Sequence, residues 1–184
     1  MNELDKISSR IAECMLCPLY KNTNNAVPGE GDASAKLVII GEAPGRFEDI
    51  QGRPFVGMSG RFLNKYLELA GIKREKVFIT NAVKHRPPNN RKPTVEEIVA
   101  CRPYLVEQLG IIRPKLLLAL GTSAATSLGF KYKHLEEVRG KTTEITLDGD
   151  KYSCFVTFHP SFPMRFPKAR ETFLNDLKAV KKYL

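Results

Sequence analysis

Apolar residues follow two periodicities along this chain, and their alternation predicts strands separated by helices. Three short runs, residues 36–41, 77–80 and 116–120, are apolar almost throughout, which is typical of strands buried on both faces of a sheet. Residues 142–147 and 151–158 flank the turn sequence Asp-Gly-Asp and predict a β-hairpin. These segments are therefore expected to supply the strands of one sheet.

Helices are predicted where apolar residues recur every three or four positions. Thr94 precedes Glu97 by the three residues of a capping box, so a helix is expected to begin there. Thr122 is expected to cap a short helix that runs to Gly129. The remaining helical stripes are Leu4, Ile7 and Ile11; Phe62, Leu63, Tyr66, Leu67 and Ala70, ended by Gly71; and Phe173, Leu177, Val180 and Leu184.

Strands alternating with helices indicate an α/β fold with a mainly parallel sheet. The chain of 184 residues contains no internal repeat or linker, so residues 1–184 are expected to form a single domain. Ligands of such sheets bind beyond the carboxyl ends of the strands. The unusual segments Gly41–Gly60, Asn81–Arg91 and His159–Arg165 all follow strand ends, so we expect one rim of the sheet to gather them.

Composition and charge narrow the classes of function. Hydrophobic residues make up 42% of the chain, and no run approaches the ~20 apolar residues of a membrane helix. The first residues lack the apolar core of a signal peptide, so a cytoplasmic protein is expected. The net charge of +9 favours a polyanionic partner, nucleic acid first, over a basic protein without such a partner.

The cysteines suggest a metal site. Cys14 and Cys17 form a CxxC pair, and Cys101 and His85 are the best further donors. On residue types alone this Cys₃His set favours zinc, although His85 could instead bind phosphate within its basic loop. Cys154 lies in an alternating strand pattern and is expected to be buried and inert.

Two loops carry features of nucleic-acid recognition. Residues 84–93 are basic and contain three prolines, which reduce the entropy that a loop loses on docking. Residues 158–165 combine His159, Ser161, Arg165 and bulky apolar groups, the mixture that an enzyme extruding a base from DNA requires. The plainer alternatives are a solvated basic loop and a histidine hydrogen-bonded at a strand end.

Together these motifs resemble a known family. The sequences GEAPG-x-x-ED-x-x-GRPFVG-x-SG (residues 41–60), TN-x-VK-x-RPPNNR-x-P (80–93) and HPS (159–161), with NAVPGEG (25–31), are similar to those of the family 4 uracil-DNA glycosylases. These are iron–sulfur enzymes of bacteria and archaea. The resemblance implies a three-layer α/β/α sandwich with a central four-stranded parallel sheet.

The resemblance also implies a [4Fe–4S] cluster in place of zinc, with Cys14, Cys17, His85 and Cys101 as ligands. The family usually has cysteine where this chain has His85. Histidine does bind cluster iron in Rieske centres, which are a different cluster type. The departure leaves three options: a histidine-ligated [4Fe–4S] cluster, which we favour, a three-iron cluster, or an engineered substitution.

Roles in base binding follow from the same resemblance. Phe55 stacks on uracil, and Asn81 reads the N3–O4 edge of the base, donating to O4 and accepting from N3–H. Glu48 crowds the C5 position and so excludes thymine. Gly41 and Ala43 let the main chain approach the base closely.

Cleavage of the glycosidic bond leaves negative charge on uracil and positive charge on the sugar. His159, placed near O2, is expected to hydrogen-bond the developing uracil anion. Glu42 is expected to orient water and to stabilise the oxocarbenium-like sugar. The better-known branch of the superfamily has an Asp where this chain has Ala43, so the motif supplies no evident strong general base.

The resemblance makes uracil-containing DNA the expected partner, with no membrane association, and the protein is expected to be a monomer. A sliding-clamp contact is common among repair enzymes, but the sequence shows no clear motif for one. Two alternatives are a non-catalytic nucleic-acid-binding protein with a metal cluster and a relative that traps uracil covalently. The residues expected to contact DNA are Lys84, Arg86, Asn89, Arg91, Ser161 and Arg165.

Overall fold

The computed structural model describes residues 2–184 and contains one mixed sheet in the order β1-β3-β2-β4-β6-β5. The four central strands, β3, β2, β4 and β6, are parallel, as predicted. Two antiparallel edge strands, β1 and β5, extend the sheet to six. The bounds are β1 Glu30–Gly31, β2 Leu37–Gly41, β3 Phe78–Asn81, β4 Leu116–Leu120, β5 Thr142–Leu147 and β6 Asp150–Thr157.

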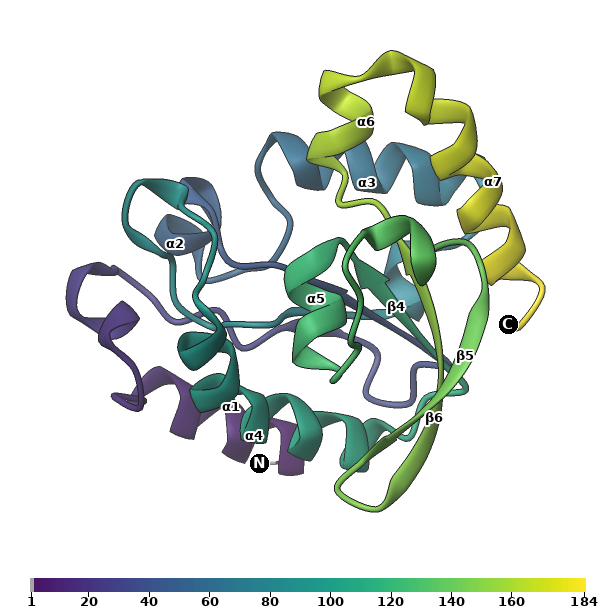
Figure 1. Ribbon diagram of the computed structural model, residues 1–184. Coiled ribbons are helices and arrows are strands. Elements are labelled where there is room, and N and C mark those ends of the chain that lie inside the picture. Colours follow the sequence, from purple (N-terminus) through teal and green to yellow (C-terminus); the bar gives the residue numbers. More distant parts are fainter. Residues whose placement is uncertain (1) are drawn as a thin grey trace.

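Helices cover both faces of this sheet and complete the predicted three-layer sandwich (Figure 1). Helices α4 and α5 pack on one face, and α3 and α7 pack on the other. Helix α1 lies against α4. The bounds are α1 Glu3–Ala12, α2 Arg46–Gln51, α3 Met58–Leu69, α4 Val95–Ile112, α5 Thr122–Ser127, α6 Ser161–Arg165 and α7 Arg170–Lys181.

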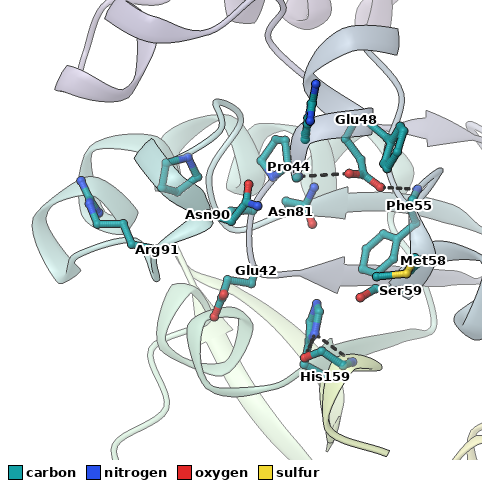
Figure 2. Close-up of a pocket in the computed structure, with 17 residues that line it drawn as sticks. Glu42, Pro44, Glu48, Phe55, Met58, Ser59, Asn81, Asn90, Arg91 and His159 are labelled. Atoms are coloured by element: carbon teal, nitrogen blue, oxygen red, sulfur yellow. Dashed lines mark hydrogen bonds between the residues drawn. The ribbon is translucent and has the colours of Figure 1, made fainter. Parts of the chain in front are cut away.

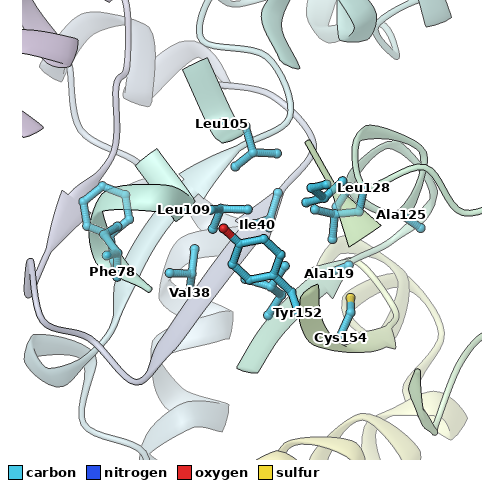
Figure 3. Packing of buried hydrophobic residues seen from close by; sticks show 14 of the residues in the cluster. Val38, Ile40, Phe78, Leu105, Leu109, Ala119, Ala125, Leu128, Tyr152 and Cys154 are labelled. Carbon is cyan, nitrogen blue, oxygen red and sulfur yellow. The ribbon is translucent and has the colours of Figure 1, made fainter. Parts of the chain in front are cut away.

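The core is divided between the two faces by the alternation of side chains along each strand. In β2, the side chains of Val38 and Ile40 face α4 and α5. They belong to the same buried cluster as Leu105 and Leu109 of α4 (Figure 3). Leu37 and Ile39 face α3 and α7. All five residues of β2 are buried, which explains why this strand is a continuous apolar run in the sequence.

Local signals located most of the elements correctly. The capping box at Thr94 is present, and β5 and β6 form the predicted hairpin. Thr122, however, is the first residue of α5 and not its N-cap, which is Gly121 with a φ of 84°. A Cβ at Gly121 would lie 2.9 Å from the Cβ of His159, so this turn needs glycine for its conformation and for its space. Helix α7 ends at Lys181, before Leu184.

The carboxyl ends of the parallel strands meet at one rim, as expected for this topology. Backbone bonds continue the pairing past the strand ends: Ala82 N–H donates to Gly41 C=O (2.9 Å), and Gly121 N–H donates to Thr157 C=O (2.8 Å). The three segments singled out in the sequence therefore start from neighbouring points. Within residues 2–184, no helix is both long and apolar enough to cross a bilayer.

The tight approach of α3 to the segment that precedes it yields a stability prediction. A Cβ on Gly60 would overlap the backbone carbonyl of Phe55, whereas a Cβ on Gly110 in α4 would meet nothing within 4 Å. We expect Gly60→Ala to lower the free energy of unfolding by about 1–3 kcal/mol through overpacking. Gly110→Ala, the matched control, should raise it by about 0.5–1 kcal/mol through helix propensity.

Urea denaturation of the two variants beside the parent protein measures both effects. Equal shifts of the two midpoints in the same direction would contradict the packing described at Gly60.

Candidate active site

A cavity of about 460 Å³ opens at the rim where the strand ends meet (Figure 2). Its walls come from all three segments that the sequence marked as unusual. Helix α2 and the start of α3 form one side, the β3–α4 loop forms another, and the segment that follows β6 contributes His159 and Ser161. Among the predicted site residues, the lining includes Glu42, Ala43, Glu48, Phe55, Asn81, Arg91, His159 and Ser161.

The close approach of Phe55 and Asn81 to the end of β2 sets the shape of the cavity. Phe55 is 6% exposed and has a φ of 52°, in the left-handed region that costs a bulky residue backbone strain. A Cβ on Gly41 would lie 2.5 Å from Cζ of Phe55 and would overlap the side-chain oxygen of Asn81. Gly41 therefore shapes the site by leaving space for two other side chains.

Glu48 holds the loop that carries Phe55. Its carboxylate accepts hydrogen bonds from the backbone N–H groups of Val56 (2.9 Å), Gly57 (2.7 Å) and Gly45 (3.1 Å). A carboxylate with three N–H donors is fixed in position, because any rotation would break charge-assisted bonds. Glu48 thus lines the cavity as predicted, and its hydrogen bonds also hold the loop in its conformation.

Asn81 presents an unused hydrogen-bonding group. The residue is 1% exposed, and its Oδ1 has no hydrogen-bond partner among residues 2–184. A buried acceptor without a partner costs about 1–3 kcal/mol, so such groups are rare unless a ligand satisfies them. Asn81 is one of the residues that line the cavity, so its amide belongs to the cavity wall.

His159 lies near Phe55, with 6.1 Å between the ring centroids. Its Nδ1 accepts a hydrogen bond from the backbone N–H of Ser161 (3.3 Å), and the Ser161 hydroxyl lies 2.8 Å from the same atom. Burial lowers the pKa of His159, against the opposing effect of the Glu42 and Glu48 charges. A neutral imidazole whose Nδ1 accepts carries its proton on Nε2, which leaves Nε2–H as a free donor.

Glu42 is held by a residue that sequence analysis did not identify. Its Oε2 accepts a hydrogen bond from the hydroxyl of Ser123 (2.6 Å), which lies near the start of α5 and is 3% exposed. The two residues are 81 positions apart in the sequence. The available signal was weak: Ser123 follows the carboxyl end of β4, at the same rim.

Several residues of the cavity mouth were not predicted from the sequence. Phe47 and Met58 are about half exposed or more, at 52% and 64%, and both line the cavity. Exposed apolar side chains at a cavity entrance suit stacking against flat ligands. Asn90 lines the cavity, whereas its predicted neighbour Asn89 is exposed outside it. The other unpredicted lining residues are Pro44, Gly45, Arg46, Gly57, Ser59 and Pro87.

Most of the predicted DNA contacts lie in or near this rim. Arg86 donates through Nε to Oδ1 of Asn90 (2.7 Å). Arg91 lies at the end of the lining far from Phe55 and forms an ion pair with Glu97 (2.6 Å) (Figure 2). Arg165, at the end of α6, is exposed but does not line the cavity.

Lys84 was predicted to contact DNA, but its side chain is buried. It is 1% exposed, and its ammonium group donates to Thr80 Oγ1 (2.5 Å), Asn81 O (2.9 Å) and Gln108 Oε1 (3.0 Å). Burial lowers the pKa of Lys84 to about 8. All three donors of the ammonium group are used inside the protein, so the predicted phosphate contact from Lys84 is wrong.

Three of the four predicted metal ligands lie in one cluster. Cys14, Cys17 and Cys101 belong to the same apolar cluster between α1 and α4. Burial raises the pKa of Cys101 to about 11, while the neighbouring charge of Lys84 acts in the opposite direction. Within residues 2–184, the geometry places no three Cys, His, Asp or Glu side chains together closely enough for a metal ion.

His85, the fourth predicted metal ligand, and Cys154, the cysteine predicted to be inert, are both buried. His85 is 6% exposed, and burial lowers its pKa against the opposing charge of Asp49. Cys154 is fully buried on β6 in the core, and burial raises its pKa to about 12, as expected of an inert thiol.

Comparison with known proteins identifies the family. The family model described as the uracil DNA glycosylase superfamily matches residues 28–180. A type-4 uracil-DNA glycosylase of Saccharolobus solfataricus is 43% identical over 189 aligned residues, covering 100% of this chain and 88% of that protein. The type-4 enzyme of Thermotoga maritima is 42% identical, covering 98% of this chain and 94% of that protein.

A third relative, the type-4 uracil-DNA glycosylase of Archaeoglobus fulgidus, is 41% identical, covering 98% of this chain and 92% of that protein. A type-5 uracil-DNA glycosylase of Pyrobaculum aerophilum is less similar, at 29% identity over 85% of this chain. The chain therefore belongs to the uracil-DNA glycosylase superfamily, and within it to the type-4 enzymes.

Proposed function

We propose that this protein removes uracil from DNA by hydrolysing its N-glycosidic bond, releasing free uracil and leaving an abasic site for base excision repair. The single observation that carries the proposal is the unsatisfied Oδ1 of Asn81 in the wall of a cavity that also contains Phe55 and His159. The type-4 relatives are named for the same activity.

Recognition of uracil follows from the chemistry of the Asn81 amide. Its Oδ1 can accept from N3–H of the base while its NH₂ group donates to O4. Cytosine presents the reverse pattern at both positions, so a pocket built around this amide would leave buried polar groups unpaired with cytosine. Phe55 provides an apolar ring on which the extruded base can stack.

Glu48 is proposed to exclude thymine. Its carboxylate lines the cavity and is held by three backbone N–H donors. A group held in this way cannot swing aside to admit the thymine methyl without breaking those bonds. The same rigidity keeps the Phe55 loop in place when the pocket is empty.

His159 is proposed to stabilise the departing base. Its free Nε2–H can donate to uracil O2 as negative charge develops there, and a preorganised donor of this kind needs no rearrangement during the reaction. Because the imidazole is neutral, Nδ1 remains available to accept from Ser161, which keeps the ring oriented.

Glu42 is proposed to act on the sugar side of the bond. Its carboxylate lines the same cavity and is anchored by Ser123, so its negative charge is held in a fixed place. A fixed carboxylate stabilises an oxocarbenium-like sugar and can orient a water molecule for attack. No stronger base is needed when departure of the leaving group is the step that the site assists most.

DNA is proposed to cross the rim beside this cavity. The candidates for phosphate contacts are Arg86, Asn89, Arg91, Ser161 and Arg165, together with the general attraction of a +9 chain for a polyanion. Phe162 is 40% exposed and stacks on Phe158, with ring centroids 4.6 Å apart. Such a supported aromatic side chain suits the gap that an extruded base leaves behind.

We also propose that Cys14, Cys17, Cys101 and His85 hold an iron–sulfur cluster. Three thiols lie in one apolar cluster, and burial keeps the imidazole of His85 neutral, the form that binds metal. A [4Fe–4S] cluster takes one protein ligand per iron, so its ligands need not meet at a single point as the ligands of one ion must. When bound, the cluster would join the CxxC segment covalently to α4 and so support the adjacent β3–α4 loop. The steps at the base and sugar use only the side chains of the cavity.

The excision proposal is tested with a labelled single-stranded oligonucleotide that contains one uracil, followed by alkali treatment. Strand cleavage is expected at uracil and not at thymine or cytosine in matched oligonucleotides. His159→Ala should lower the single-turnover rate about 100-fold or more, because a donor to the leaving group is lost. Binding of the uracil oligonucleotide without any cleavage by the parent protein would instead support a non-catalytic binding protein.

The lowered pKa of His159 predicts a pH effect on stability. Below about pH 6.5 an unfolded chain protonates this histidine while the folded protein resists it. This contribution to stability is therefore present above that pH and is lost as the pH falls toward the lowered folded-state value. The difference in melting temperature between the parent and His159→Asn, which cannot titrate, should shift against the parent on acidification from pH 8 to pH 5. A pH-independent difference would contradict the assignment.

The cluster proposal is tested by iron and zinc analysis and by visible absorption of purified protein. Iron and a broad visible band are expected in the parent protein and in Cys154→Ser, the matched control for loss of a buried thiol. Cys14→Ser and Cys101→Ser should lose both signals, and His85→Cys should keep them. A colourless parent protein containing zinc would overturn the assignment.

A further inference from the structure

Lys84 is a buried cation with a complete set of hydrogen bonds. It is among the largest fully buried side chains of the protein, and no ion pair involves it within residues 2–184. Burying a charge is costly unless hydrogen bonds replace its hydration. A cation kept at this cost beside a ligand cavity calls for a structural reason.

The hydrogen bonds of Lys84 join β3 to α4, and two of its acceptors extend the network to the segment at Pro28. Its ammonium group donates to Thr80 in β3, to the backbone carbonyl of Asn81 and to Gln108 in α4. The Thr80 hydroxyl and the Gln108 amide each donate in turn to the carbonyl of Pro28, both at 2.8 Å. An ammonium group offers three donors from one nitrogen atom on a flexible stem, which matches the three acceptors gathered here.

This network fixes the peptide from which Asn81 extends. Asn81 is the last residue of β3, and its side-chain oxygen has no partner within the described chain. The direction of its amide therefore depends on packing against Gly41 and on how firmly its backbone is held. The bond from the Lys84 ammonium group to Asn81 C=O (2.9 Å) holds that backbone directly.

We infer that Lys84 is a positioning residue for base recognition, which holds Asn81 in the orientation that pairs with uracil. The inference rests on the proposed role of Asn81 in binding the base. It explains why a lysine in a basic loop faces inward while Arg86 and Arg91 on the same loop remain at the surface. Lys84 acts through Asn81 and does not touch the base or the DNA backbone.

The test compares Lys84→Met, which keeps the length of the side chain, with the parent protein in two binding measurements. The first is the inhibition constant of free uracil, which engages the base pocket alone. The second is the dissociation constant for DNA that contains an abasic site, which engages the phosphate contacts without a base. Loss of orientation should weaken uracil binding about tenfold, since small misplacements of a supporting group are costly in preorganised sites. Affinity for abasic DNA should change by less than about twofold.

Asn81→Ala and the double variant make the test specific. If Lys84 acts through Asn81, Lys84→Met should cause no further loss of uracil affinity in the Asn81→Ala background. Additive losses would overturn the inference while leaving the base-binding role of Asn81 intact. An Asn81→Ala protein with unchanged uracil affinity would overturn that role and, with it, the inference.

Two further variants separate positioning from general loss of stability. Val180→Ala removes fully buried apolar volume from α7 on the other face of the sheet and should lower the melting temperature without changing uracil affinity. Thr80→Val removes one acceptor of Lys84 with little change in volume, and it serves if Lys84→Met does not fold. A roughly threefold loss of uracil affinity is expected for Thr80→Val, since one of three bonds is removed. Equal effects of Val180→Ala and Thr80→Val on uracil affinity would overturn the inference.

Discussion

The active site depends on the absence of a side chain at Gly41, where β2 ends. The ring of Phe55 and the amide of Asn81 both occupy the space that a Cβ would fill there. Without that close approach the aromatic and the polar wall of the cavity would be further apart, and a flat base could not contact both. The strained backbone of Phe55 is tolerated because Gly60 lets α3 pack tightly against the same segment.

Charged side chains hold the loops around this point. Glu48 binds three backbone N–H groups, and the guanidinium of Arg74 donates to the carbonyl of Pro54 (2.8 Å). Glu97 caps its own helix and binds Arg91. These charged side chains would be counted as available to DNA or metal from the sequence alone. In the structure they are instead paired with groups of the loops. The cavity is rigid because backbone groups that would face water are paired internally.

The proposed mechanism assigns one cavity side chain to each of the two charges that glycosidic cleavage creates. In the proposed mechanism, the neutral imidazole of His159 would face the base as it becomes an anion, and the carboxylate of Glu42, anchored by Ser123, would face the sugar as it becomes a cation. Each group is held by a serine, Glu42 by Ser123 in α5 and His159 by Ser161 at the start of α6, so neither would have to move in the proposed reaction. The fold therefore holds Glu42 and His159 in separate, fixed positions.

The sequence by itself determined the elements whose signals are local. Continuous apolar runs indicated buried parallel strands, Thr94 and Glu97 located the start of α4, and Asp148-Gly149-Asp150 located the hairpin. It also determined that the three unusual segments share a rim, because parallel strands end at the same edge of a sheet. Recognition of the motifs added eight of the residues that line the cavity.

Only the tertiary structure decided where individual polar side chains of those segments point. Lys84 looked like its basic neighbours in the sequence, but the packing of Gln108 and Pro28 behind β3 turns it inward. Ser123 became a partner of Glu42 only through the meeting of β2 and β4 at one rim. Such partners are set by contacts between residues far apart in the chain, and no local pattern of hydrophobic and polar positions encodes them.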